Sequence, residues 1–205
     1  MTRSPVARLR AFLAHETGGV SVETVIIFPL LLWAYAAMFI YWDAFKAQNV
    51  NLKATYTIAD MISREDSDPP IIPDYIDGMN DLYAYLIRSD EGNDVRVSVV
   101  DFVADPLDPA APASMCLRWS HATGSYLGHP DVTPLEDDLP ILPGGSQLIV
   151  VETRMTWSPP FNFQLEPIGL DTRDMVNLVF TSPRFVPQVR WDSNSDGNPD
   201  DVACA

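Results

Sequence analysis

The sequence has few of the residues on which catalytic and metal sites are usually built. Its 205 residues include three histidines and two cysteines. His121 and His129 match no zinc motif in their spacing, and we expect both to be solvated loop residues. No phosphate-binding loop, dinucleotide-binding fingerprint or nucleophile-elbow serine motif is present. We therefore expect a non-enzymatic protein, with an exported hydrolase of unrecognised site as one alternative.

Basic residues are also scarce. The chain has 13 Lys and Arg against 28 Asp and Glu, which gives a net charge of −15. Residues 43–205 hold 10 of these basic and 26 of these acidic side chains. A surface of that charge repels nucleic acid and anionic lipid, so no nucleic-acid partner is expected.

Residues 24–42 contain no charged side chain at all. As a helix this segment is about 28 Å long, close to the roughly 30 Å of a bilayer core, so we place a transmembrane helix at residues 19–43. A buried core helix is an alternative, but helices of soluble domains usually keep a polar stripe. A signal peptide cleaved after Ala36 is another, although the apolar run continues to Ile40 and Glu23 interrupts its start.

The residues that flank this segment predict its orientation. Arg3, Arg8 and Arg10 precede it against one acid, Glu16, whereas Asp43 and an acidic chain follow it. The positive-inside rule then places the N-terminus in the cytoplasm and the remainder outside. Tyr41 and Trp42, at the end of the segment, are typical of an aromatic belt at the outer interface.

Beyond the apolar segment the pattern predicts an α+β fold in which helices precede a mostly antiparallel sheet. Residues 44–64 lack Gly and Pro and have apolar residues at helical spacing, including Phe45 and Tyr56. They form a stalk helix, a core helix of the exported domain, or both along one long element. Residues 65–205 are expected to form one domain with proline-rich loops at 105–112 and 130–143. Within it we expect a helix at 74–88 and strands at 95–103, 115–120, 148–157, 176–181 and 185–191.

A polar run near the C-terminus has oxygen-bearing side chains at alternate positions and a glycine after the third. This pattern is similar to the start of EF-hand and dockerin-type calcium loops. The twelfth position is Ala203, so the usual bidentate acid is missing, and a polar turn is the alternative reading. The predicted calcium ligands are Asp192, Asn194, Asp196, Asn198 and Asp200.

The residues at the start of the apolar segment carry a resemblance to a known family. Type IV pilins have a basic leader that a prepilin peptidase removes after a glycine, which leaves a glutamate fifth in the mature helix. A cut between Gly18 and Gly19 makes Glu23 the fifth residue. More narrowly, residues 9–45 resemble the N-terminus of TadE/TadF-like proteins, the minor pseudopilins of tight-adherence (Tad/Flp) pilus systems, although Thr24 stands where that family usually has a large apolar residue. The fitting residues are Glu16, Gly18, Val20, Val22, Glu23 and Pro29.

The resemblance implies a pilus-assembly subunit in a bacterial inner membrane. Residues 1–18 would be its cytoplasmic leader and residues 65–205 a periplasmic domain. Its partners would be the prepilin peptidase, other pilin-like subunits and the Tad secretion machinery. Glu23 would pair with the amino terminus of a neighbouring subunit at Gly19, and Pro29 would kink the helix. A single-pass membrane protein with a periplasmic ligand- or partner-binding domain is the second function class.

The two cysteines, Cys116 and Cys204, both lie on the exported side. An oxidising periplasm favours a disulfide between them, which would tie the C-terminal end to the sheet. Two unpaired thiols are the alternative.

Overall fold

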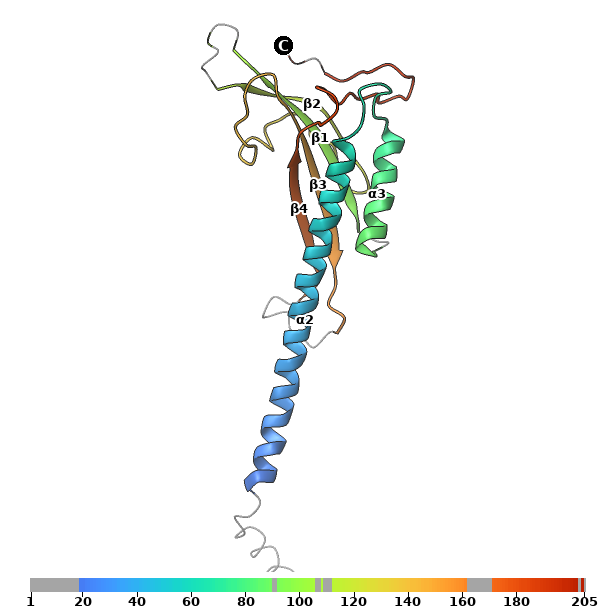
Figure 1. Ribbon diagram of the computed structural model, residues 1–205. Coiled ribbons are helices and arrows are strands. Elements are labelled where there is room, and N and C mark those ends of the chain that lie inside the picture. The colour runs from blue at the N-terminus through green and yellow to red at the C-terminus, as the bar shows by residue number, and fades with distance from the viewer. Residues whose placement is uncertain are drawn as a thin grey trace, which may run out of the picture.

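A computed structural model describes residues 19–89, 92–105, 108, 112–161, 171–202 and 204, and the side chains from residue 21 onward within this set. Two helices and a four-stranded sheet make up the described fold, so the α+β prediction is confirmed (Figure 1). Gly18 and the rest of the predicted leader lie outside the described residues.

The helix α2, Gly19–Ile62, runs for 44 residues and is therefore about 66 Å long. Its first half projects away from the rest of the molecule, and its second half lies along the sheet (Figure 1). The last turn is closed by Ser63, whose amide bonds to the Ala59 carbonyl at 3.0 Å. The apolar segment and the predicted stalk are thus one helix, and the second half belongs to the core of the domain.

The helix α3, Pro73–Ile87, begins with a proline at a position where the helix needs no amide donor. It ends at Arg88, which is left-handed with φ 57°, and the Ser89 amide bonds back to the Ala84 carbonyl at 3.2 Å. The helix predicted at 74–88 is thus confirmed, and its buried face consists of Ile76, Met79, Tyr83 and Ile87.

The sheet contains β1 (Asp94–Val103), β2 (Ser114–Ala122), β3 (Gln147–Trp157) and β4 (Arg173–Thr181). Their order is β2-β1-β3-β4, and every neighbouring pair is antiparallel. The first four predicted strands are therefore confirmed. The described part of the loop 130–143 is free of helix and strand, also as predicted.

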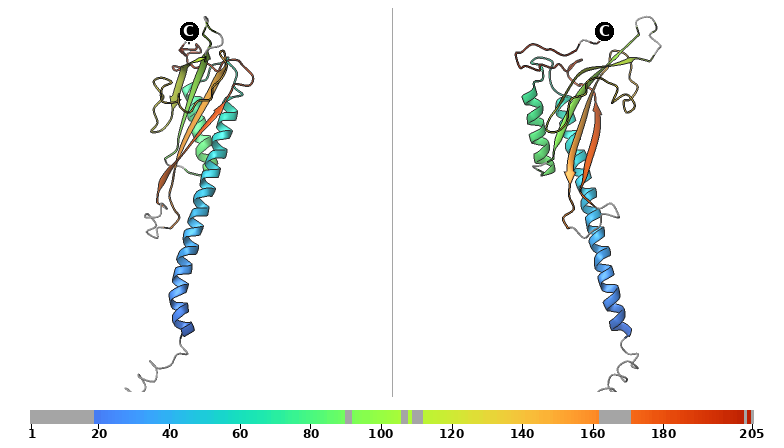
Figure 2. Two further views of the ribbon diagram at one scale, coloured as in Figure 1. Left: turned by 90° about the vertical axis from the view of Figure 1, so that its left-hand side faces the viewer. Right: turned by 180° about the vertical axis from the view of Figure 1, so that it is seen from behind.

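Both faces of the sheet are apolar. One face packs against α2 and α3, which lie on the same side of the sheet (Figure 2), and contributes Val97, Val99, Ile149 and Val151 to the main core. The opposite face forms a smaller cluster in which Val100, Phe102, Leu148 and Val150 meet Leu135 and Leu139 from the loop 130–143. Because alternate strand residues point to opposite faces, Ile149 and Val151 of β3 face the helices, whereas Leu148 and Val150 face the loop.

The predicted strand 185–191 is wrong. Its residues pair with the body of the domain through one parallel bridge, between Ile71 and Trp191. The Ile71 amide bonds to the Arg190 carbonyl at 2.9 Å, and the Asp192 amide bonds to the Ile71 carbonyl at 2.9 Å. Pro187 has no amide hydrogen to donate, so the segment is poorly suited to extend the sheet.

Candidate assembly site

The first half of α2 is almost entirely exposed. Every residue from Ser21 to Tyr35 is exposed, although most of them are apolar. Among the described residues, α2 is the one helix long and apolar enough to span a membrane, with a window of mean hydropathy 2.0 that is 11% buried. An apolar surface of this extent marks contact with a membrane or with another protein. Its large apolar residues are Val22, Val25, Ile26, Ile27, Phe28, Leu30, Leu31, Leu32 and Trp33.

Glu23 is the one acidic residue on this exposed half-helix. It lies four residues after Gly19, about 6 Å along the helix axis and on the same face. Glu23 lines a shallow surface depression together with Thr24, Ile27 and Phe28. No residue that the structure describes forms an ion pair or hydrogen bond with the Glu23 carboxylate. A carboxylate in such apolar surroundings is costly unless a cation satisfies it.

Pro29 lies in the interior of this half-helix. It has no amide hydrogen, so the carbonyl of Val25 loses its helical partner. The helix nevertheless continues without interruption to Ile62.

Buried polar side chains fix the second half of α2 against the sheet. Asn51 is fully buried, and its side-chain amide donates to the Met175 carbonyl of β4 at 3.0 Å. Its carbonyl oxygen accepts from the Tyr83 hydroxyl of α3 at 2.6 Å. Thr55, one turn later, meets Thr153 of β3 at 2.7 Å between hydroxyl oxygens. One asparagine thus connects α2, α3 and β4. These bonds fix the rotation of α2 about its axis and its position along that axis relative to the sheet.

Two further contacts continue this row toward the exposed half-helix. Gln48 donates to the Asn177 side chain at 2.9 Å, and the Trp157 indole donates to the Asp43 carboxylate at 3.1 Å. Phe45 and Tyr56, two of the apolar residues at helical spacing in this segment, are exposed. The helix instead turns its polar Asn51 and Thr55 toward the sheet, where they find hydrogen-bond partners.

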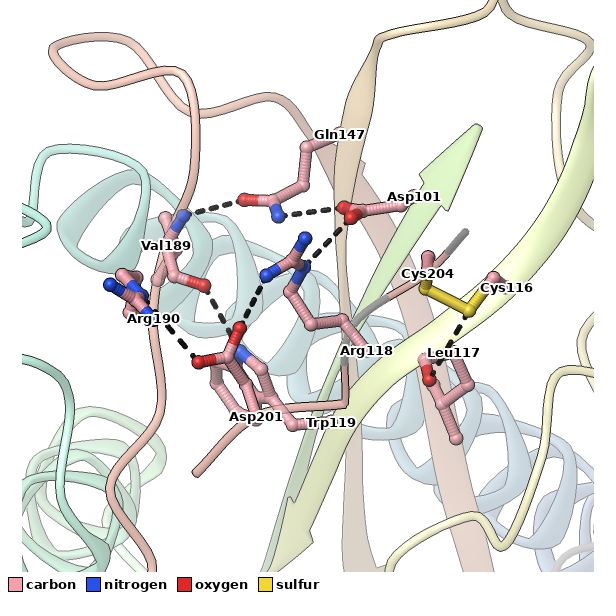
Figure 3. A network of polar contacts seen from close by, with 10 residues as sticks. All are labelled: Asp101, Cys116, Leu117, Arg118, Trp119, Gln147, Val189, Arg190, Asp201 and Cys204. Carbon is pink, nitrogen blue, oxygen red and sulfur yellow. Dashed lines mark hydrogen bonds and ion pairs between the residues drawn. A yellow bond between two sulfur atoms is a disulfide. The ribbon is translucent and has the colours of Figure 1, made fainter. Parts of the chain in front are cut away.

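The disulfide predicted between Cys116 and Cys204 is present, with a Cα–Cα distance of 6.0 Å (Figure 3). Beside it, the Arg118 guanidinium binds Asp101 at 2.7 Å and also pairs with Asp201 (Figure 3). The Val202 amide adds a bond to the Arg118 carbonyl at 3.0 Å. The C-terminal segment is therefore tied to β2 by covalent, ionic and backbone contacts.

The same network reaches the chain that precedes this segment. Gln147 donates to Asp101 at 2.7 Å and accepts from the Val189 amide at 2.6 Å. The Trp119 indole donates to the Val189 carbonyl at 3.1 Å, and its ring stacks on Trp191 with centroids 4.8 Å apart. Figure 3 shows Asp101, Arg118 and Gln147, from β1, β2 and β3, beside Val189 and Asp201 of the C-terminal segment. We call this segment, residues 185–202 and 204, the strap. These contacts tie the chain around Val189 to β1, β2 and β3.

The carboxylates of the predicted calcium loop accept hydrogen bonds from backbone amides of the same loop. The carboxylate of Asp192 is buried and accepts bonds from the amides of Asn194, Asp196 and Gly197, the last at 2.7 Å. The Asp196 carboxylate accepts from the Asn198 amide at 2.8 Å, and Asp200 accepts from the Ser193 amide at 3.0 Å. Within the described ranges, no group of three or more His, Cys, Asp or Glu is arranged to hold a metal ion. Calcium binding stays a prediction from the sequence.

His121 and His129 are not solvated, contrary to expectation, and only His129 lies in a loop. His121 lies in β2 with its ring 4.9 Å from that of Trp191, and burial lowers its pKa. His129 is nearly buried, and its Nε2 lies 2.8 Å from a Glu152 oxygen that also binds Arg96. Although burial alone would raise the pKa of Glu152, the hydrogen bonds from Arg96 and His129 hold it below its ordinary value. These contacts hold the loop before His129 against the sheet.

No family model, curated protein or solved structure matches this chain.

Proposed function

We propose that this protein is a non-enzymatic, membrane-anchored pilus-assembly subunit, a minor pseudopilin of a Tad-like system. The observation that carries the proposal is the division of α2 into two halves. The first half exposes an apolar surface with a single carboxylate, Glu23, whereas the second half is locked into the domain through Asn51 and Thr55. Such a helix fixes the orientation of its exposed half relative to the domain, as an assembly element requires.

In this proposal the first half of α2 crosses the bacterial inner membrane. The N-terminus lies in the cytoplasm and the domain in the periplasm, in accordance with the charges that flank the apolar segment. A prepilin peptidase removes the leader between Gly18 and Gly19. The other pilin-like subunits and the Tad secretion machinery are then the partners of the mature helix.

The new amino group of Gly19 supplies the cation that Glu23 lacks within the described chain. Two neighbouring subunits in the membrane can satisfy each other in this way, and a buried carboxylate whose cationic partner is removed is strongly destabilised. Glu23 therefore acts as half of an intersubunit ion pair and has no chemistry of its own.

Incorporation of Glu23 variants tests this role. Glu23→Gln keeps the shape and removes the charge, whereas Glu23→Asp keeps the charge. We expect both variants to insert into the membrane, Glu23→Gln to be lost from purified assemblies, and Glu23→Asp to be partly retained. Glu136→Gln, which removes an exposed carboxylate from the loop 130–143, serves as the control. Incorporation of Glu23→Gln at the level of Glu136→Gln would contradict the pairing role.

A further inference from the structure

The chain that leaves β3 continues along α2 toward its exposed half. Trp157, the last residue of β3, donates its indole hydrogen to Asp43 at 3.1 Å. Four residues later, the ring of Phe161 lies 6.3 Å from the ring of Phe39. The end of β3 points toward the projecting half of α2 in the views of Figures 1 and 2. The chain thus reaches down the side of the helix as far as Phe39.

Phe39 lies within the uncharged segment, three residues before its end at Trp42. At the rise of an α-helix, this is about 4.5 Å inside the end of that segment. Phe161 is placed beside it at the same level, and 51% of the Phe161 side chain remains exposed. Phe161 follows Trp42 by 119 positions in the sequence, yet it lies level with the end of the apolar segment.

The surroundings of Phe161 have the composition of a membrane interface. Tyr41, Trp42 and Phe45 are all exposed at this level of α2. The Lys46 ammonium lies 5.6 Å from the centre of the Trp42 ring. Aromatic rings with an adjacent long cationic side chain are typical of the headgroup region, where the ring lies among lipid and the charge reaches water.

We propose that Phe161 inserts into the outer leaflet of the bilayer that α2 crosses, as a second membrane contact of the domain. This inference rests on the proposed membrane span. The occupant is phospholipid because the half-exposed Phe161 ring lies 6.3 Å from that of Phe39, which belongs to the exposed apolar surface of α2. A helix alone leaves the domain free to rotate about the helix axis and to tilt. A second contact, displaced sideways from the axis, restricts both motions and presents one side of the domain to neighbouring subunits.

Depth-dependent quenching of a fluorescent label tests the contact in the full chain, reconstituted into phosphatidylcholine vesicles. The native cysteines are bonded to each other, so a thiol-reactive dye reports one introduced cysteine. The three variants are Phe161→Cys, Leu31→Cys within the apolar segment, and Ile141→Cys, whose parent side chain is 92% exposed. We expect the label at 161 to be quenched by shallow nitroxide lipids, the label at 31 by deep ones, and the label at 141 by aqueous iodide.

The alternative outcomes separate the two proposals. Iodide quenching at 161 with deep quenching at 31 would overturn the lipid contact and leave the membrane span intact. A label at 161 that is shielded from both iodide and nitroxide lipids would indicate contact with a second copy or another protein, which also overturns it. Iodide quenching at 31 would refute the span itself and the inference with it.

Hydroxyl-radical footprinting of the unmodified chain in the same vesicles tests the contact without a substitution. Phe185 is the internal control, since its side chain is exposed to a similar extent, 67% against 51% for Phe161. We expect Phe161 to be oxidised at least fivefold more slowly than Phe185. Equal rates would overturn the inference.

Discussion

Removal of the Asn51 side chain should uncouple α2 from the domain at large cost. Asn51→Leu keeps the approximate volume but takes the partner from the Tyr83 hydroxyl and from the Met175 carbonyl. Burial raises the pKa of Tyr83 to about 12, so this hydroxyl is protonated at neutral pH and needs an acceptor. A buried polar group without a partner costs about 1–3 kcal/mol, so two such groups predict a loss of about 2–6 kcal/mol.

A double-mutant cycle separates the hydrogen bond from the loss of packing. Tyr83→Phe alone should cost about 1–2 kcal/mol, because it leaves the Asn51 oxygen with the longer contact to Thr153 at 3.4 Å. The double variant removes both the donor and the acceptor of this hydrogen bond, so neither is left buried without a partner. Its loss of stability should therefore be at least about 1 kcal/mol smaller than the sum of the two single losses. Lys53→Leu, an exposed position two residues along the same helix, is the control and should change stability by less than about 0.5 kcal/mol.

Urea unfolding of the full chain in detergent, followed by tryptophan fluorescence, measures these values. The tryptophans Trp119, Trp157 and Trp191 all lie in the core of the domain and report its unfolding. If the urea midpoint of Asn51→Leu equalled that of Lys53→Leu, the hydrogen bonds of Asn51 would not stabilise the domain. Strict additivity in the cycle would also refute the reasoning, since the two side chains would then not interact.

Two further predictions concern the C-terminal strap and the loop before His129. The disulfide closes a separation of 88 residues, for which chain entropy gives an upper estimate of about 4.6 kcal/mol of stabilisation. Replacement of both cysteines by serine should therefore lower the urea midpoint by up to about 2 M, at an m value of about 2 kcal/mol/M. An unchanged midpoint would contradict this. The pKa of Glu152 is lowered in the folded state, so its contribution to stability is present above its unfolded value and is lost as the pH falls through the folded one. Melting of Glu152→Gln between pH 6 and pH 3 should therefore show a smaller acid-induced fall in Tm than the wild type, whereas parallel falls would contradict the role of Glu152.

Much of the fold could be predicted from the sequence because its apolar pattern is strong. The valine alternation around Val97 predicts β1, and the apolar stripe through Ile76 and Tyr83 predicts α3. The disulfide followed from having two cysteines on the same predicted side of a membrane. These elements depend on local periodicity or on simple topology, which a single sequence contains.

The contacts that the sequence did not predict depend on partners far along the chain. Asn51 looks like a solvent-facing residue because its partners, Tyr83 and Met175, lie 32 and 124 positions away. The segment before Trp191 has an apolar composition suited to a strand, yet it crosses the end of the sheet as a strap. Phe161 gives no local sign that it lies beside Phe39. Tertiary packing decides these positions, and periodicity does not.

We propose that this chain is an assembly subunit whose mature helix begins at Gly19. Mass spectrometry of the N-terminal peptide, from protein extracted from membranes with and without an active prepilin peptidase, tests it most directly. We predict an N-terminus at Gly19 that requires the peptidase. An intact N-terminus at Met1 in the presence of the peptidase would contradict the claim and leave an ordinary membrane anchor, and an N-terminus at Ala37 would instead indicate a cleaved signal peptide.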